Sequence, residues 1–140
     1  MSRLPLSLPD YRALAEFRFQ IRSFLSFSER AARSQGIEPQ QHQLLLACKG
    51  LPEGKRPTIG ALAQRLCVEH HTTVALVDKL EAANLVQRGP SPVDRREVLV
   101  QITEQGEALL SSLSELHRHQ LATVGPHLSA ALAAVLEART

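Results

Sequence analysis

Apolar residues recur at the spacing of α-helices along most of the chain. The first predicted helix covers residues 10–35, with Asp10 as its N-cap and Gly36 as its C-cap. The positions that repeat along one face are Leu14, Phe17, Ile21, Phe24, Leu25 and Ser28. Phe19 and Phe27 fall outside that stripe, so we expect this helix to carry apolar surface on more than one face.

The middle of the chain predicts three shorter helices. One runs from Pro39 to Lys49, because proline is favoured in a first turn and Gly50 follows the last residue. Residues 51–57 hold two prolines and a glycine and predict a loop. Two helices follow around a tight turn at 67–69, with Thr58 as the N-cap of the first and Asn84 as the left-handed C-cap of the second. Their expected buried positions are Ile59, Leu62, Ala63 and Leu66, then Val74, Val77 and Leu80.

A β-hairpin is predicted where the helical rhythm stops. The segment LVQR forms one strand, GPSPVDRR the turn and EVLVQI the second strand. Thr103 then opens a helix whose leucines continue to Leu121, and the Gly-Pro pair at 125 and 126 is expected to end it. A last helix is predicted over about residues 127–138.

The order helix, turn, helix, hairpin predicts a mainly α fold with a small β-hairpin wing, that is, a winged helix-turn-helix. A helix about 10 to 12 Å across fits the major groove of B-DNA, and a hairpin beside it reaches the neighbouring minor groove. We expect three regions: a helical region at 1–35, the winged helix-turn-helix at 36–106 and terminal helices at 107–140. Double-stranded DNA is therefore the expected partner.

Composition and charge narrow the picture. The net charge of +2 arises within residues 55–97, which hold seven Lys or Arg and five Asp or Glu, whereas the remainder has nine of each. All five aromatic residues lie in the first 27, so the basic segment lacks rings on which single-stranded bases stack. No apolar run approaches the roughly 20 residues of a membrane span, and no secretory signal is evident. We expect a cytoplasmic protein with no membrane partner.

The wing SPVDRREVLV crowds charge at its turn. Neither a turn nor a core-facing strand requires arginine there, so Arg95 and Arg96 need a partner outside the hairpin. The narrow minor groove concentrates negative potential and favours an inserted guanidinium. Asp94 is expected to hold such an arginine extended through a bidentate contact. A merely solvated turn is the alternative interpretation.

Four segments resemble the MarR family of bacterial transcriptional regulators: PQQHQLLLA, TIGALAQRL, TTVALVDKLEAANLV and SPVDRREVLVQITEQG. The marks of the family are Asp94-x-Arg96 at the wing, VDKLE at the end of the recognition helix and ITEQG at the entry to the long C-terminal helix, and they are specific together. The resemblance implies that helices in 1–35 and 107–140 interlock two subunits. It also implies that the homodimer binds a palindromic operator, usually as a repressor, and that a small aromatic or anionic effector releases it.

Departures from the family pattern affect which residues read DNA. The family often has Gly at Cys67, Ser-Pro at Glu69 and His70, and Arg at Ala75. Base contacts are therefore expected from His71 and Thr72, with His70 as a further candidate. The full set of expected DNA-binding residues is His70, His71, Thr72, Ala75, Lys79, Asp94, Arg95 and Arg96, with Lys79 on phosphate.

Other functions have less support. The sequence has no phosphate-binding loop or nucleophile motif and indicates neither an enzyme nor a cofactor. A winged helix used for protein contacts would carry apolar residues on the exposed face of 70–79, where the chain has His71, Thr72 and Lys79. Cys67, expected as a small buried residue in the turn, leaves open a redox-responsive regulator. His117 and His119 are two apart on a helix and face different ways, which argues against a shared metal.

Overall fold

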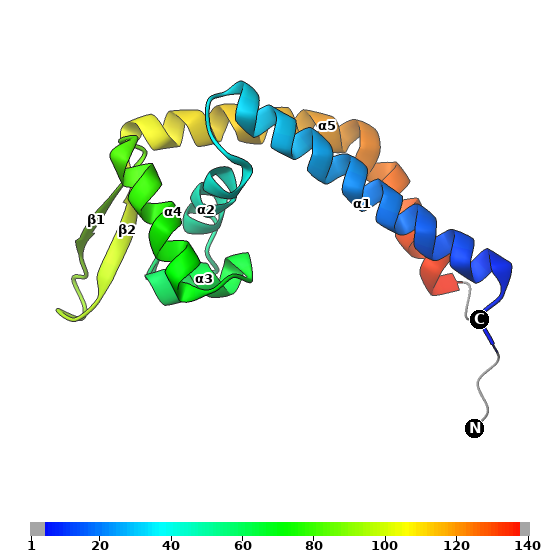
Figure 1. Ribbon diagram of the computed structural model, residues 1–140, viewed down its shortest axis with the longest axis horizontal. Helices are drawn as coiled ribbons and strands as arrows, with labels where there is room; N and C mark the ends of the chain where they lie inside the picture. Colours follow the sequence, from blue (N-terminus) through cyan, green and yellow to red (C-terminus); the bar gives the residue numbers. More distant parts are fainter. Residues whose placement is uncertain (1–4, 138–140) are drawn as a thin grey trace. The chain divides into compact units, whose positions relative to one another are not determined.

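The computed structural model describes residues 5–137 and divides them into two units. The winged-helix unit comprises residues 32–114, and the terminal-helix unit comprises the described residues before 32 and after 114. The elements in chain order are α1 (Leu8–Ser34), α2 (Pro39–Lys49), α3 (Ile59–Leu66), α4 (His70–Ala82), β1 (Val86–Pro90), β2 (Val98–Ile102) and α5 (Glu104–Glu137) (Figure 1). Winged helix-turn-helix architecture, predicted from the sequence, is confirmed.

Local chemistry explains the helix-turn-helix. Thr58 caps α3 as predicted, because its Oγ1 accepts a hydrogen bond from the Ala61 amide at 3.1 Å. Cys67 ends α3 in the left-handed conformation with φ of 57°, and Asn84 follows α4 with φ of 61°. Asparagine tolerates that region better than most residues, whereas cysteine has no such preference, which explains why glycine suits position 67 in related patterns.

The core of the winged-helix unit lies between α2, α3, α4 and the hairpin. The largest fully buried apolar side chains of the unit are Leu44, Leu45, Leu62, Val77, Leu80, Val86 and Val100, together with Leu113 of α5. The predicted inward stripe of α4 is partly wrong, because Thr73 and Leu76 are buried while Val74 is only half-buried. Thr73 tolerates burial because its hydroxyl donates to the Glu69 carbonyl at 3.2 Å. The inward face therefore follows positions 73, 76, 77 and 80.

The hairpin is antiparallel, and it is attached to the chain ahead of α3. Val86 pairs with Ile102 and Pro90 with Val98 at its two ends. On the other edge of β2, Thr58 forms a bridge with Leu99, and the Val100 amide donates to the Pro57 carbonyl at 2.9 Å. The segment before the helix-turn-helix thus pairs with the outer edge of β2 as a short third segment of the wing sheet.

In the terminal-helix unit, α1 and the last part of α5 run side by side (Figure 1). The predicted N-cap Asp10 is wrong. Ser7 precedes α1, its amide donates to Asp10 Oδ2 at 2.8 Å, and its Oγ accepts from the Asp10 amide at 3.4 Å. This reciprocal pair satisfies two amides at the helix start, so Asp10 supports the cap from the first turn.

The predicted break at residues 125 and 126 is also wrong. Helix α5 continues through Pro126 to Glu137 as one element. Proline removes one backbone donor but its fixed φ is compatible with a helix, so the result is a change of direction, which is visible in the orange-to-red part of α5 (Figure 1). No helix among the described residues is long and apolar enough to cross a membrane.

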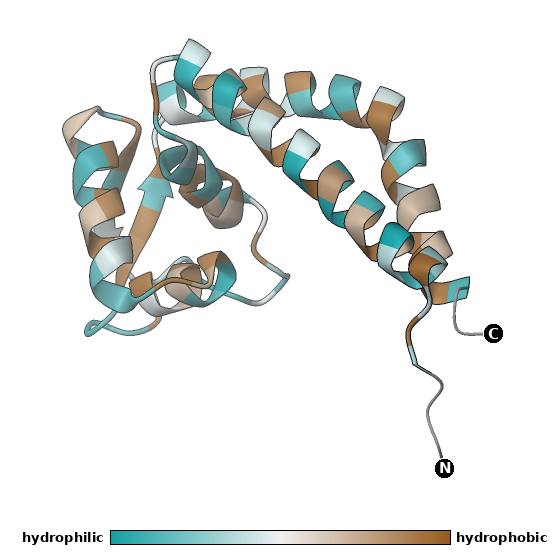
Figure 2. Ribbon diagram, turned by 45° about the vertical axis from the view of Figure 1, so that its right-hand side comes forward, coloured by the Kyte–Doolittle hydropathy of each residue, from teal (hydrophilic) through white to brown (hydrophobic). Residues whose placement is uncertain are grey.

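The two helices of the terminal-helix unit meet at a polar-aromatic cluster and leave much apolar surface exposed. His117 Nε2 lies 2.7 Å from Ser28 Oγ, and the rings of Phe24 and Phe27 contact the imidazole edge-on. Phe27 therefore belongs to the packed face, contrary to the predicted stripe. Hydrophobic and hydrophilic segments alternate along both helices (Figure 2). The large apolar side chains left exposed in this unit are Leu6, Leu8, Tyr11, Leu14, Phe19, Leu25, Leu116, Leu121, Leu132 and Leu136.

Candidate nucleic-acid interface

The solvent-facing side of α4 carries the helix residues that the sequence predicts to contact DNA. His70, His71, Ala75 and Lys79 are exposed, and Thr72 is half-buried. The opposite side holds the buried stripe that begins at Thr73, so α4 is fixed on the core by one face only. The exposed residues of α4 are polar except for the small Ala75 and Ala82, and a small residue at position 75 permits a close approach to a duplex.

An acidic residue on the same helix was not assigned a role from the sequence. Asp78 is exposed next to Lys79, and its Oδ1 accepts from Arg88 Nη2 at 2.6 Å. Arg88 also donates its backbone amide and Nη1 to the two carboxylate oxygens of Glu81, at 3.0 and 2.7 Å. These bonds, led by the one from the Arg88 amide, lower the pKa of Glu81. Arg88 thus offsets the negative charge of α4 and joins this helix to β1.

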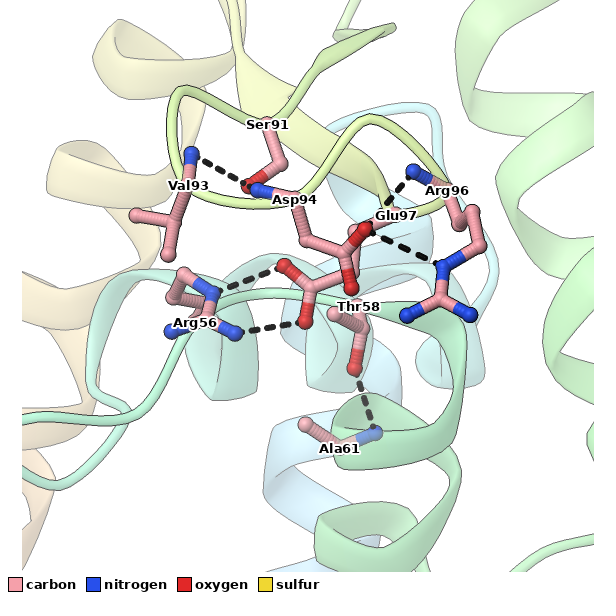
Figure 3. A network of polar contacts seen from close by, with 8 residues as sticks. All are labelled: Arg56, Thr58, Ala61, Ser91, Val93, Asp94, Arg96 and Glu97. Atoms are coloured by element: carbon pink, nitrogen blue, oxygen red, sulfur yellow. Dashed lines mark hydrogen bonds and ion pairs between the residues drawn. The ribbon is translucent and has the colours of Figure 1, made fainter.

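The wing turn is built on Ser91 and Asp94 (Figure 3). Ser91 is buried, and its Oγ accepts from the amides of Val93 and Asp94, both at 3.2 Å. Asp94 Oδ1 accepts from the Arg96 amide at 2.9 Å and from Arg96 Nε at 3.4 Å. Asp94 therefore shapes the backbone of the turn and orients the arginine at the same time.

The predicted bidentate contact between Asp94 and Arg96 is wrong in its geometry. One carboxylate oxygen accepts both bonds, and only Nε of the guanidinium takes part. The two terminal nitrogens of Arg96 carry no dashed line to Asp94 (Figure 3), and the side chain is 92% exposed. The donors that recognise phosphate or a base edge in a groove thus remain outward, and Arg95 beside them is exposed as well.

A second ion pair joins the wing to the chain before α3. Arg56 donates from Nε to Glu97 Oε2 at 2.8 Å and from Nη2 to Glu97 Oε1 at 2.6 Å. This contact, which is bidentate, lowers the pKa of Glu97. From the sequence alone, Arg56 and Arg88 had no predicted role beyond their contribution to the positive charge of residues 55–97. Arg56 lies 41 residues from its acid, so no local pattern indicated the pair.

The two cysteines occupy contrasting environments. Cys48 is half-buried, its thiol donates to the Val100 carbonyl at 3.3 Å, and burial raises its pKa to about 11. Cys67 is exposed, so the expectation of a buried residue is wrong. It borders a hollow of about 340 Å³ with Lys55 and Arg65. Within residues 5–137 no three His, Cys, Asp or Glu side chains converge as metal ligands.

These environments predict different thiol reactivity. At pH 8 an aromatic disulfide reagent should modify Cys67 within minutes and leave Cys48 unmodified until the protein unfolds, because the thiolate is the reactive form. Cys67→Ser should remove the fast phase, whereas Cys48→Ser should leave it unchanged. Equal rates for both thiols in the folded protein would contradict the assignment.

An exposed polar helix face, a short turn and an arginine-tipped hairpin in one unit define a winged helix-turn-helix protein. The family model described as the MarR family matches residues 35–97, which lie within this unit. The winged-helix unit belongs to the MarR family.

Individual relatives agree with this classification. The HTH-type transcriptional repressor NicR of Pseudomonas putida is 42% identical over 52 residues, covering 37% of this chain and 33% of NicR. The chain thus spans about a third of that relative. AbsC, a MarR family transcriptional regulator from Streptomyces coelicolor, has a TM-score of 0.72 at 20% identity, covering 87% of this chain and 82% of AbsC. CouR from Rhodococcus jostii, solved with p-coumaroyl-CoA, has a TM-score of 0.62 at 26% identity, covering 71% and 68%.

Proposed function

We propose that this chain is a sequence-specific transcriptional regulator that binds double-stranded DNA through the winged-helix unit. The observation that carries the proposal is the pairing of an outward polar face on α4 with an outward Arg96 guanidinium oriented by Asp94. Helix α4 would enter the major groove, and the wing would enter the adjacent minor groove.

Each residue has a distinct role in this proposal. His71 and Thr72 contact base edges, His70 does so at the helix start, and the small Ala75 permits close approach. Lys79 contacts phosphate, which strengthens binding to every sequence alike. At the wing, Arg96 enters the minor groove, Asp94 orients it and Arg95 contacts the backbone beside it.

We further propose that the functional form is a homodimer joined through the terminal-helix unit. The exposed leucine and aromatic side chains of α1 and the exposed leucines of α5 support this, because monomeric proteins rarely leave much apolar surface exposed in one region. Two-fold symmetry would match a palindromic operator with half-sites about one turn apart, roughly 34 Å. Analytical ultracentrifugation at micromolar concentration should give a dimer, and a monomer would contradict this part of the proposal.

The regulatory direction proposed is repression that a small effector relieves. The relative NicR is named a repressor, and CouR was solved with an acyl-CoA thioester, which supports effector binding in this family. In this proposal the effector binds tightly to an arrangement of the two winged-helix units that does not fit both half-sites. It binds less tightly to the arrangement that does fit them, so it releases the dimer from DNA. A small aromatic or anionic molecule is the class we propose for this chain.

Selection of bound sequences from random duplex DNA at fixed salt tests the proposed function. The full chain should enrich a palindrome whose half-site centres lie about 10 base pairs apart. A protein used for protein contacts would enrich no sequence over a control without protein. The polar character of the outward face of α4 favours the DNA-binding outcome.

A further inference from the structure

Arg56 and Glu97 form the contact that links the wing tip to the helix-turn-helix. We propose that Arg56 is a positioning residue, which holds the wing in the orientation that lets Arg96 and α4 engage one duplex together. The inference rests on the proposed DNA-binding function, and it adds a residue outside the expected contact set. Its structural basis can be followed in Figure 3, from Arg56 through Glu97 to Arg96.

The ion pair acts directly on the turn that carries the arginines. Glu97 follows Arg96 in the chain, its amide donates to the Asp94 carbonyl at 3.0 Å, and its carbonyl accepts from the Ser91 amide at 3.4 Å. Ser91 and Asp94 of the turn are therefore both hydrogen-bonded to the backbone of Glu97. Because two parallel hydrogen bonds join the planar guanidinium to the carboxylate, they restrict rotation of Glu97 as well as its distance from Arg56.

The other end of the contact is equally well connected. Arg56 precedes Pro57, whose carbonyl accepts the Val100 amide at 2.9 Å, and Thr58, whose hydroxyl caps α3. Helix α3 packs against α4 in the same unit. Three consecutive residues, 56 to 58, thus connect the wing tip to α3, the helix that packs against α4.

The alternative is that Arg56 contributes only positive charge toward DNA. The two interpretations predict opposite results for Glu97→Gln, which removes a negative charge near the wing. A charge effect alone would strengthen DNA binding, whereas loss of the positioning contact would weaken it. Arg56→Lys separates them again, because lysine keeps the charge but lacks the planar pair of donors.

The experiment compares these variants by fluorescence anisotropy on a duplex that the wild-type full chain has selected, at one salt concentration. Arg56→Lys and Glu97→Gln should each weaken binding by about 3- to 10-fold, and Lys55→Ala, a neighbouring exposed cation, is the matched charge control. Introduced into the wild-type protein, Arg56→Ala should weaken DNA binding by a similar factor. Introduced into the Arg96→Ala variant, it should change DNA affinity by less than about 2-fold, because Arg56 acts through the contact that Arg96 makes.

Hydrogen exchange without DNA provides a readout that does not depend on the proposed function. The amides of residues 93–97 should exchange faster in Arg56→Lys and Glu97→Gln, while those of α3 stay protected. Tighter binding by Glu97→Gln, wild-type affinity for Arg56→Lys, or additive effects of Arg56→Ala and Arg96→Ala would overturn the positioning role. If the wild type selects no duplex, the proposed function fails, and the exchange data still decide whether the contact holds the wing.

Discussion

Arg96→Ala is expected to weaken binding to the selected operator by about 1 to 3 kcal/mol for each wing that engages the duplex. The side chain is 92% exposed, and among residues 5–137 only its Nε forms a hydrogen bond, so its removal should leave the fold intact. Each cation that replaces a counterion contributes about 0.9 to the slope of log K against log salt. The variant should therefore also show a shallower salt dependence.

Two matched variants separate the role of Arg96 from simple loss of charge. Asp94→Asn should weaken binding less than Arg96→Ala, because the amide oxygen still accepts from the Arg96 backbone while the orienting charge is lost. Lys79→Ala should weaken operator and scrambled duplex by similar factors, as expected for a phosphate contact. Unchanged affinity and salt slope in a folded Arg96→Ala protein would show that the wing does not take part in binding.

Gly106→Ala is expected to destabilise the winged-helix unit by about 3 kcal/mol, near the upper end of the usual cost of overpacking. A Cβ at this position would overlap the Leu85 carbonyl oxygen and lie 2.7 Å from Ile102 Cγ2. The backbone oxygen cannot turn aside, because it accepts from the Thr103 amide at 3.1 Å. The hairpin base or the start of α5 must shift instead.

Urea unfolding followed by circular dichroism checks this expectation, with Gly60→Ala as its control. Gly60 is an exposed residue of α3, and a methyl group added there would meet no atom within 4 Å. Alanine at position 60 should therefore be neutral or stabilise by up to about 1 kcal/mol. Similar unfolding midpoints for Gly106→Ala and wild type would contradict the close packing at the wing base.

Elements with strong local chemistry were predictable from the sequence. Thr58 as a cap, Asn84 as a left-handed residue and the hairpin around SPVDRR each depend on a few adjacent residues, and the structure confirms them. The order of helix, turn, helix and hairpin predicted the winged-helix class, and resemblance added the MarR family, which the family model over residues 35–97 supports. The roles of α4 and wing residues toward DNA stay predictions.

The errors occurred where tertiary structure outweighs local preference. Pro126 lies inside α5 because a helix tolerates one missing hydrogen bond when its neighbours continue it. Thr73 is buried because its hydroxyl has a partner within its own helix, so a polar residue occupies a position that the apolar pattern omitted. Arg56 and Glu97 are 41 residues apart, and no periodicity relates them.

A hydroxyl-radical footprint of the full chain on its selected duplex tests the central claim most directly, since cleavage reports access to the minor groove. We predict protection of the minor groove on the outer side of each major-groove half-site, where the wings lie. Arg96→Ala should lose this outer protection at a protein concentration that saturates the duplex. Methylation interference at purines in the half-sites, which reports major-groove contacts of α4, should persist under the same conditions. A wild-type footprint without outer protection, or one that Arg96→Ala leaves unchanged, would contradict insertion of the wing.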